Sequence, residues 1–131
     1  ADMIIHAGDI GSPETYAHLR QIAPVKACLG NNDWPDLYGP SIKKRVGLLS
    51  EGLRWMVCHF EKDLNLDDCD IAICGHTHRS FIRQDKQTHT LIMNPGSPTW
   101  PRANGPSIGR ILVADTAVVE ATIINLDANL S

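Results

Sequence analysis

The chain has 131 residues, of which 43% are hydrophobic and 21% are charged. This length and composition fit one folded domain and argue against a disordered or fibrous chain. Twelve Lys and Arg against fifteen Asp and Glu give a formal net charge of −3, which disfavours a nucleic-acid partner. The apolar runs are far shorter than the ~18 residues of a membrane span, so no membrane association is expected.

The cysteines follow no CxxC spacing, and three of them lie in or beside apolar runs that resemble strands. This pattern favours reduced, buried thiols over a disulfide framework. Together with the lack of an apolar leader at the first residues, it predicts a cytoplasmic protein. The four residues are Cys28, Cys58, Cys69 and Cys74.

The first third of the chain predicts a strand, a helix and a second strand. Residues 3–6 form a short apolar run, and Ser12-Pro13-Glu14 is typical of a helix N-terminus, with a capping serine and a first-turn proline. The helix should extend to about Ile22 because Pro24 ends it, and residues 25–29 form the next apolar run. Such a unit implies parallel pairing of its two strands.

The rest of the chain predicts mostly strands. Residues 45–49 and 53–58 should form a hairpin, residues 61–70 a short acidic helix, and residues 71–74 a buried strand. Prolines make residues 34–40 and 94–102 irregular loops. Further strands are expected at 80–83, 90–93, 107–114 and 118–124. The fold class is therefore α/β, with two mixed sheets and helices covering their outer faces.

Polar side chains follow four of these strands, where loops at strand ends commonly converge on one crevice. Carboxylate, amide and imidazole groups together suit divalent Mn, Fe, Co, Ni or Zn. Each group alone also has an ordinary explanation, since Gly-Asp and Gly-Asn are common turns and a lone histidine is often a core residue. The combination predicts a metal site formed by Asp9, Asn31, His59, His76 and His78.

The same segments resemble the calcineurin-like metallophosphoesterases. The stretches IIHAGDIGSPE, GNNDW and NPGSPTWPR are similar to the small bacterial and archaeal phosphodiesterase branch of that superfamily. The resemblance implies a four-layer α/β/β/α sandwich with two metal ions between its sheets, which activate a hydroxide that cleaves a small phosphoester.

The resemblance also implies a role for each site residue. Asp9 would bridge the two metals, His78 would bind the first metal, and Asp33 would orient a neighbouring group. The remaining ligands of the second metal would be Asn31, His59 and His76.

The sequence departs from the family pattern at three places. Relatives open with an Asp-x-His motif that supplies two ligands of the first metal, and none precedes Ala1. We therefore expect residues 1–131 to be an N-terminally truncated domain without its first core strand. Asn32 stands where many relatives have a histidine, and an amide cannot act as a general acid, which favours activated leaving groups. Phe60 replaces a usual glycine, and Glu61 is either a substitute ligand or, as we favour, solvated.

Two other residues and two functional alternatives stay open. His6 is expected to be a core histidine, and Arg102 either contacts a phosphate or belongs to a rigid turn. A non-catalytic scaffold that binds partners, as in retromer-type relatives, is the alternative to a phosphodiesterase or phosphatase. The missing ligands favour the scaffold, whereas the five retained ones favour the enzyme. An absent strand would leave a sheet edge open, so a homo-oligomer is also an option.

Overall fold

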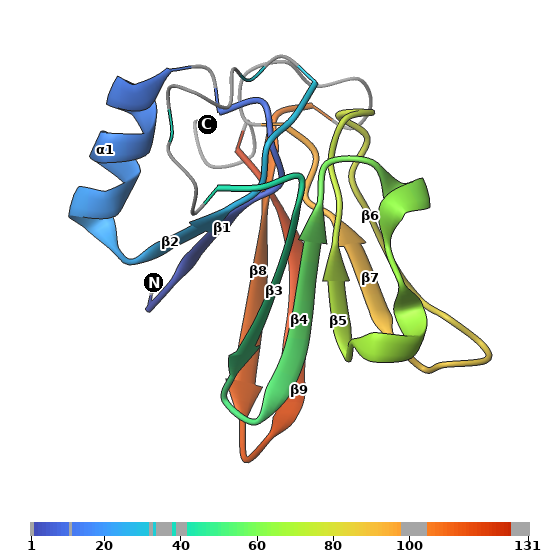
Figure 1. Cartoon of the computed structure of the whole chain (residues 1–131). Coiled ribbons are helices and arrows are strands. Elements are labelled where there is room, and N and C mark those ends of the chain that lie inside the picture. Colours follow the sequence, from blue (N-terminus) through green and yellow to red (C-terminus); the bar gives the residue numbers. More distant parts are fainter. Residues whose placement is uncertain are drawn as a thin grey trace.

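The computed structural model describes residues 2–10, 12–31, 33, 38, 42–97 and 105–126, and its strands form three sheets (Figure 1). A parallel pair contains β1 and β2, a mixed sheet has the strand order β3-β4-β5-β7-β6, and β8 pairs with β9 in an antiparallel hairpin. The strands are β1 (Ile4–His6), β2 (Val25–Ala27), β3 (Arg45–Ser50), β4 (Leu53–Cys58), β5 (Ile71–Ile73), β6 (Phe81–Gln84), β7 (Leu91–Asn94), β8 (Ser107–Ala114) and β9 (Ala117–Asn125).

The predicted strand-helix-strand unit is confirmed. Helix α1 (Pro13–Ile22) begins where the Ser12 hydroxyl accepts a hydrogen bond from the Thr15 amide at 3.1 Å, and β1 runs parallel to β2. The second strand is shorter than predicted because regular pairing stops at Ala27, and Cys28 instead forms an isolated bridge with Lys43. No helix in the described ranges is long and apolar enough to cross a membrane.

The mixed sheet aligns several strand ends on one side of the molecule. The hairpin of β3 and β4 turns at Glu51 and Gly52, whose φ values of 55° and 76° suit the tight turns that match strand twist. Strand β4 then lies parallel to β5, and β5 lies parallel to β7. Because these three strands run in the same direction, their carboxyl ends lie at the same edge of the sheet. The loops that follow the strands therefore begin close together.

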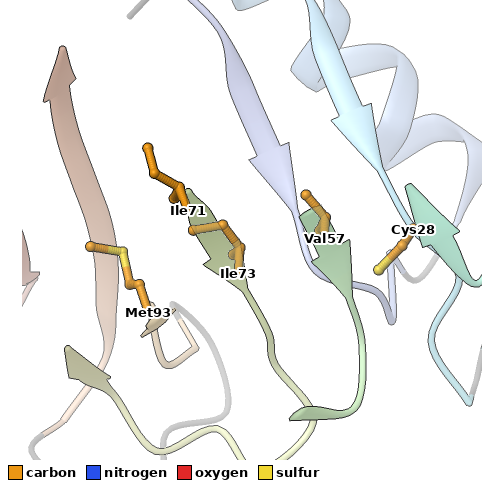
Figure 2. Packing of buried hydrophobic residues seen from close by; sticks show 5 residues of the cluster. All are labelled: Cys28, Val57, Ile71, Ile73 and Met93. Carbon is orange, nitrogen blue, oxygen red and sulfur yellow. The ribbon is translucent and has the colours of Figure 1, made fainter. Parts of the chain in front are cut away.

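The main core lies between the mixed sheet and the other two strand pairs. Figure 2 shows five of its side chains, among them Val57 from β4 and Met93 from β7. Ile5 of β1 and Ile111 and Ile123 of the β8–β9 hairpin pack against this cluster. On the far side of β1 and β2, Tyr16 of α1 packs against a second cluster. The order of layers is thus helix, sheet, sheet, as expected for the sandwich.

The fourth layer differs from the predicted helix. Over residues 61–70 the chain forms two 3₁₀ turns, η2 (Glu61–Asp63) and η3 (Leu66–Asp68), which cover the outer face of the mixed sheet through Leu64 and Leu66. The Asn65 side chain accepts a hydrogen bond from the Asp67 amide at 3.2 Å. Such local bonds compete with the bonds of an α-helix, which explains why this acidic segment does not form one.

All four cysteines are buried free thiols, as predicted. Burial raises the pKa of Cys28 and of Cys74 to about 12, so at pH 8 only about one in 10⁴ of these thiols is ionised. We expect a disulfide-exchange reagent such as Ellman's reagent to release far less than one equivalent of thiol from the native protein and close to four after denaturation. Rapid native reaction of several thiols would contradict this packing.

Candidate functional site

The candidate site forms where loops leave β1, β2, β4 and β5. Asp9 follows β1, Asn31 follows β2, His59 is the residue after β4, and His76 lies in the loop after β5. His59 is the most deeply buried of them, with 3% of its surface exposed. These four residues come from different strand ends and lie together, as the sequence predicts.

The His59 imidazole is the centre of the group. Its Nδ1 lies 2.7 Å from the Ala7 carbonyl oxygen, and a carbonyl only accepts, so Nδ1 carries the hydrogen. In the neutral ring Nε2 then has a lone pair, and it lies 2.8 Å from Asn31 Oδ1, 3.2 Å from His76 Nδ1 and 3.4 Å from Asp9 Oδ2. Three potential ligand atoms thus surround one imidazole nitrogen.

The distances between these atoms are similar to those between atoms that bind one metal ion. His76 Nδ1 is also 3.2 Å from Asn31 Oδ1, which closes a triangle with His59 Nε2. Atoms that bind one metal at about 2.0–2.2 Å are about 3 Å apart. Two lone pairs, those of His59 Nε2 and Asn31 Oδ1, face one another, an arrangement that needs a proton or a cation between them.

The amide oxygen of Asn31 is essential to this fit. Across the described residues, no three His, Cys, Asp or Glu side chains are placed to hold a metal ion by themselves. The triangle consists of two imidazoles and one amide, with the Asp9 carboxylate beside them. Residues of these types suit a divalent transition metal.

The loops that carry these candidate ligands have unusual backbones. Asp9 has a φ of 57°, and His76 and His78 have φ values of 67° and 58°, which is uncommon for residues with a side chain. Gly8 has a φ of 98°, and an added Cβ there would lie 2.6 Å from His59 Nδ1. Such strain is concentrated at functional sites more often than elsewhere.

Asp33 connects the loop after β1 to the loop after β2 through hydrogen bonds. Its Oδ2 accepts hydrogen bonds from the Gly30 amide at 2.8 Å and from the Ile10 amide at 3.1 Å. These bonds tie the chain beside Asp9 to the chain beside Asn31. The orienting role that the resemblance implied for Asp33 therefore has a physical route, which runs through the backbone.

Two of the other predicted residues, His78 and Glu61, lie within the described part of the chain. His78 is half-buried two residues beyond His76 on the same loop, while Asn32 and Arg102 lie outside the described residues. Glu61 is exposed and forms an ion pair with Arg83 at 2.7 Å, which agrees with a solvated carboxylate rather than a ligand.

His6 is a hydrogen-bonded histidine, as expected. Its Nδ1 accepts from the Gly8 amide at 3.2 Å, and burial lowers its pKa. This bond holds the turn that leads into Asp9, so His6 supports the site from the strand side.

The sequence did not predict the contacts of two residues near the site, Phe60 and Asn94. The Phe60 ring lies 5.0 Å from the His59 ring and 4.5 Å from the His76 ring, measured between centroids. Asn94, buried at the end of β7, donates hydrogen bonds to the loop that carries His76. A departure from the family pattern pointed to Phe60, but nothing local in the sequence indicates the direction of either side chain.

Comparisons with known proteins identify relatives along nearly the whole chain. The chain is 34% identical to a probable metallophosphoesterase of Methanothermobacter thermautotrophicus, over 97% of this chain and 77% of that protein. It is 33% identical to a probable metallophosphoesterase of Methanocaldococcus jannaschii, over 96% of this chain and 67% of that protein.

Solved structures share the fold at lower identity. An archaeal phosphodiesterase matches with a TM-score of 0.74 and 20% identity, over 95% of this chain and 84% of that one. Vps29 from Entamoeba histolytica, solved in complex with Zn²⁺, matches with a TM-score of 0.73 and 18% identity, over 94% and 80%. The family model for the calcineurin-like phosphoesterase superfamily domain matches residues 1–117, and the chain belongs to that superfamily.

Proposed function

We propose that this protein hydrolyses phosphoesters, phosphodiesters in particular, and that it depends on a bound divalent metal. Family membership supports phosphoester hydrolysis as the general reaction. The metal dependence is our inference from one observation, the contact of His59 Nε2, Asn31 Oδ1 and His76 Nδ1 with one another at 2.8–3.2 Å.

These three atoms would hold the metal, with the Asp9 carboxylate beside them and His78 as a further proposed ligand. A divalent ion such as Mn, Ni, Fe, Co or Zn would supply a Lewis acid for the phosphoryl oxygens and would lower the pKa of a bound water. The Ala7 carbonyl fixes the His59 tautomer so that Nε2 is free to donate its lone pair.

The remaining residues of the site position these ligands and restrict access. Asp33 holds the loops of Asp9 and Asn31 at a fixed separation, and the Phe60 ring covers one side of His76. We propose that Asn32 can donate a hydrogen bond to a leaving group but cannot protonate it. Small phosphodiesters with activated leaving groups are therefore the proposed substrates, with Arg102 as a proposed phosphate contact.

The proposal is tested with bis(p-nitrophenyl) phosphate. The chelated protein should be inactive, and Mn²⁺ or Ni²⁺ should restore hydrolysis. The variant His76→Ala should lose at least about 100-fold in rate because it removes one corner of the ligand triangle. His18→Ala, on the exposed face of α1, is the matched control and should keep full activity. Equal background rates for the protein with metal and for His76→Ala would refute the proposed enzyme.

A non-catalytic scaffold is the second candidate, because the fold matches a Vps29 about as well as it matches a phosphodiesterase. That Vps29 was solved with Zn²⁺, so metal binding in this fold does not by itself indicate catalysis. The activity assay separates the two functions. Metal binding without hydrolysis would favour the scaffold.

A further inference from the structure

Asn94 connects the end of β7 to the loop that carries His76. It is 1% exposed, and its strand lies beside β5, with Met93 opposite Ile73. The chain leaving β5 therefore passes directly alongside Asn94. The Cys74 amide continues this pairing with a hydrogen bond to the Met93 carbonyl at 3.0 Å.

The backbone at His76 is a strained three-residue turn. The Thr77 amide donates to the Gly75 carbonyl at 2.8 Å, and His76 between them has a φ of 67°. A turn of this kind with a left-handed central residue is rare and unfavourable for a residue with a side chain. Something outside the turn has to hold it in place.

The Asn94 side chain bonds both residues that flank His76. Its Nδ2 donates to the Gly75 carbonyl at 3.0 Å and to Thr77 Oγ1 at 3.2 Å, and its Oδ1 accepts from the Gly96 amide at 2.9 Å. The orientation of the amide is unambiguous, because Gly75 offers only an acceptor and Gly96 only a donor here.

We propose that Asn94 is a positioning residue for the metal site: it holds the turn that directs His76 Nδ1 toward His59 and Asn31. The inference rests on the proposed function, since it assigns Asn94 a role through a proposed ligand. No hydrogen bond of the described residues joins Asn94 to a ligand atom, so its effect passes through the backbone of the loop.

The variant Asn94→Asp tests this proposal with almost unchanged side-chain volume. A carboxylate cannot donate, so it places an acceptor against the Gly75 carbonyl and weakens the turn. We expect Co²⁺ to bind about 10–100-fold more weakly than to the unaltered protein, the range typical of residues that orient metal ligands. The visible absorption bands of bound Co²⁺ should also shift, because the His76 ligand is displaced.

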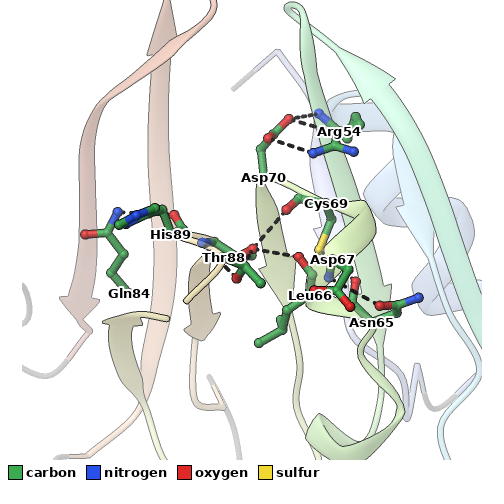
Figure 3. A network of polar contacts seen from close by, with 10 residues as sticks. Arg54, Asn65, Leu66, Asp67, Cys69, Asp70, Gln84, Thr88 and His89 are labelled. Atoms are coloured by element: carbon green, nitrogen blue, oxygen red, sulfur yellow. Dashed lines mark hydrogen bonds and ion pairs between the residues drawn. The ribbon is translucent and has the colours of Figure 1, made fainter. Parts of the chain in front are cut away.

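Thr90 offers a matched control at the other end of the same strand. It precedes β7, is fully buried, and its hydroxyl oxygen lies 2.9 Å from both the Leu66 and the Cys69 carbonyl oxygen, which share its one proton. Leu66 and Cys69 lie in the polar network of Figure 3, on the η3 side of the sheet. Thr90→Val removes comparable buried bonds, so it should lower thermal stability and leave Co²⁺ affinity and spectrum unchanged.

A milder variant and a metal-free measurement complete the test. Thr77→Val removes one of the two hydrogen bonds from Asn94 to this loop, together with the Arg79 amide bond to the same hydroxyl at 3.3 Å, at an exposed residue. It should weaken Co²⁺ binding a few-fold, even if Asn94→Asp does not fold. Without metal, either variant should speed hydrogen exchange at the Thr77 amide.

Unchanged Co²⁺ affinity, unchanged Co²⁺ spectrum and unchanged hydrogen exchange in these variants would overturn the positioning role of Asn94. If the unaltered protein does not bind Co²⁺ but the exchange rate rises, the proposed metal site is wrong and the restraint on the loop stands.

Discussion

Replacing His59 by alanine is expected to reduce metal-dependent hydrolysis by at least about 1,000-fold, more than any other single change at the site. His59 Nε2 contacts Asn31, His76 and Asp9, so its removal leaves the proposed metal without its central ligand. The loss should appear as background rates of bis(p-nitrophenyl) phosphate hydrolysis and as loss of Co²⁺ binding in a titration. Each factor of ten corresponds to about 1.4 kcal/mol of lost transition-state stabilisation.

A second substitution at His59 separates the lost ligand from lost stability. His59→Ala also leaves a cavity and an unpaired Ala7 carbonyl, at a cost of about 2–4 kcal/mol in free energy of unfolding. In His59→Asn, the side-chain amide can still donate to the Ala7 carbonyl in place of Nδ1, but it has no group at the position of Nε2. We expect this variant to unfold at a higher temperature than His59→Ala but to bind metal no more tightly than His59→Ala does. Metal binding by both variants would contradict the central role of Nε2.

The elements that sequence could predict are those with local causes. The capping Ser12 and the first-turn proline predict the start of α1 at Pro13, and two apolar runs around a short polar turn predict the hairpin. The same approach located Asp9, Asn31, His59 and His76 because each follows a strand, and parallel strands bring their ends together. Assignment of these residues as ligands remains a prediction.

The features that sequence could not predict depend on side-chain direction across large sequence separations. Asn94 acts 19 and 17 positions away, on Gly75 and Thr77, and no periodic pattern encodes such a bond. The acidic, non-strand pattern of residues 61–70 predicts a short helix, whereas in the structure the Asn65 side chain accepts a hydrogen bond from the nearby Asp67 amide and the segment forms two 3₁₀ turns instead. In both cases the hydrogen bonds of one asparagine, Asn94 or Asn65, restrain the backbone conformation.

Gly30→Ala is expected to be strongly disruptive, because the loops that carry Asp9 and Asn31, two proposed ligands, touch at this position. A Cβ on Gly30 would collide with the backbone nitrogen and the side chain of Asp9, and neither can move without breaking the contact of Asp9 with His59. Overpacking of this kind costs up to about 3 kcal/mol, which for a domain of this size lowers the melting temperature by roughly 10 °C. Differential scanning calorimetry measures the shift, and a Co²⁺ titration should show weakened binding in the fraction that still folds.

Gly47→Ala is the matched control for this change. Gly47 lies in β3, and a Cβ there would have as its nearest neighbour the Trp55 carbonyl oxygen at 3.9 Å, an ordinary contact. Alanine in a strand also loses less conformational freedom on folding than glycine does, so the melting temperature should stay the same or rise by a few degrees, with metal affinity unchanged. If Gly30→Ala behaved like Gly47→Ala, the loops of Asp9 and Asn31 could not be packed as closely as the site requires. The close approach at Gly30 therefore links the stability of this fold to the geometry of its proposed metal ligands.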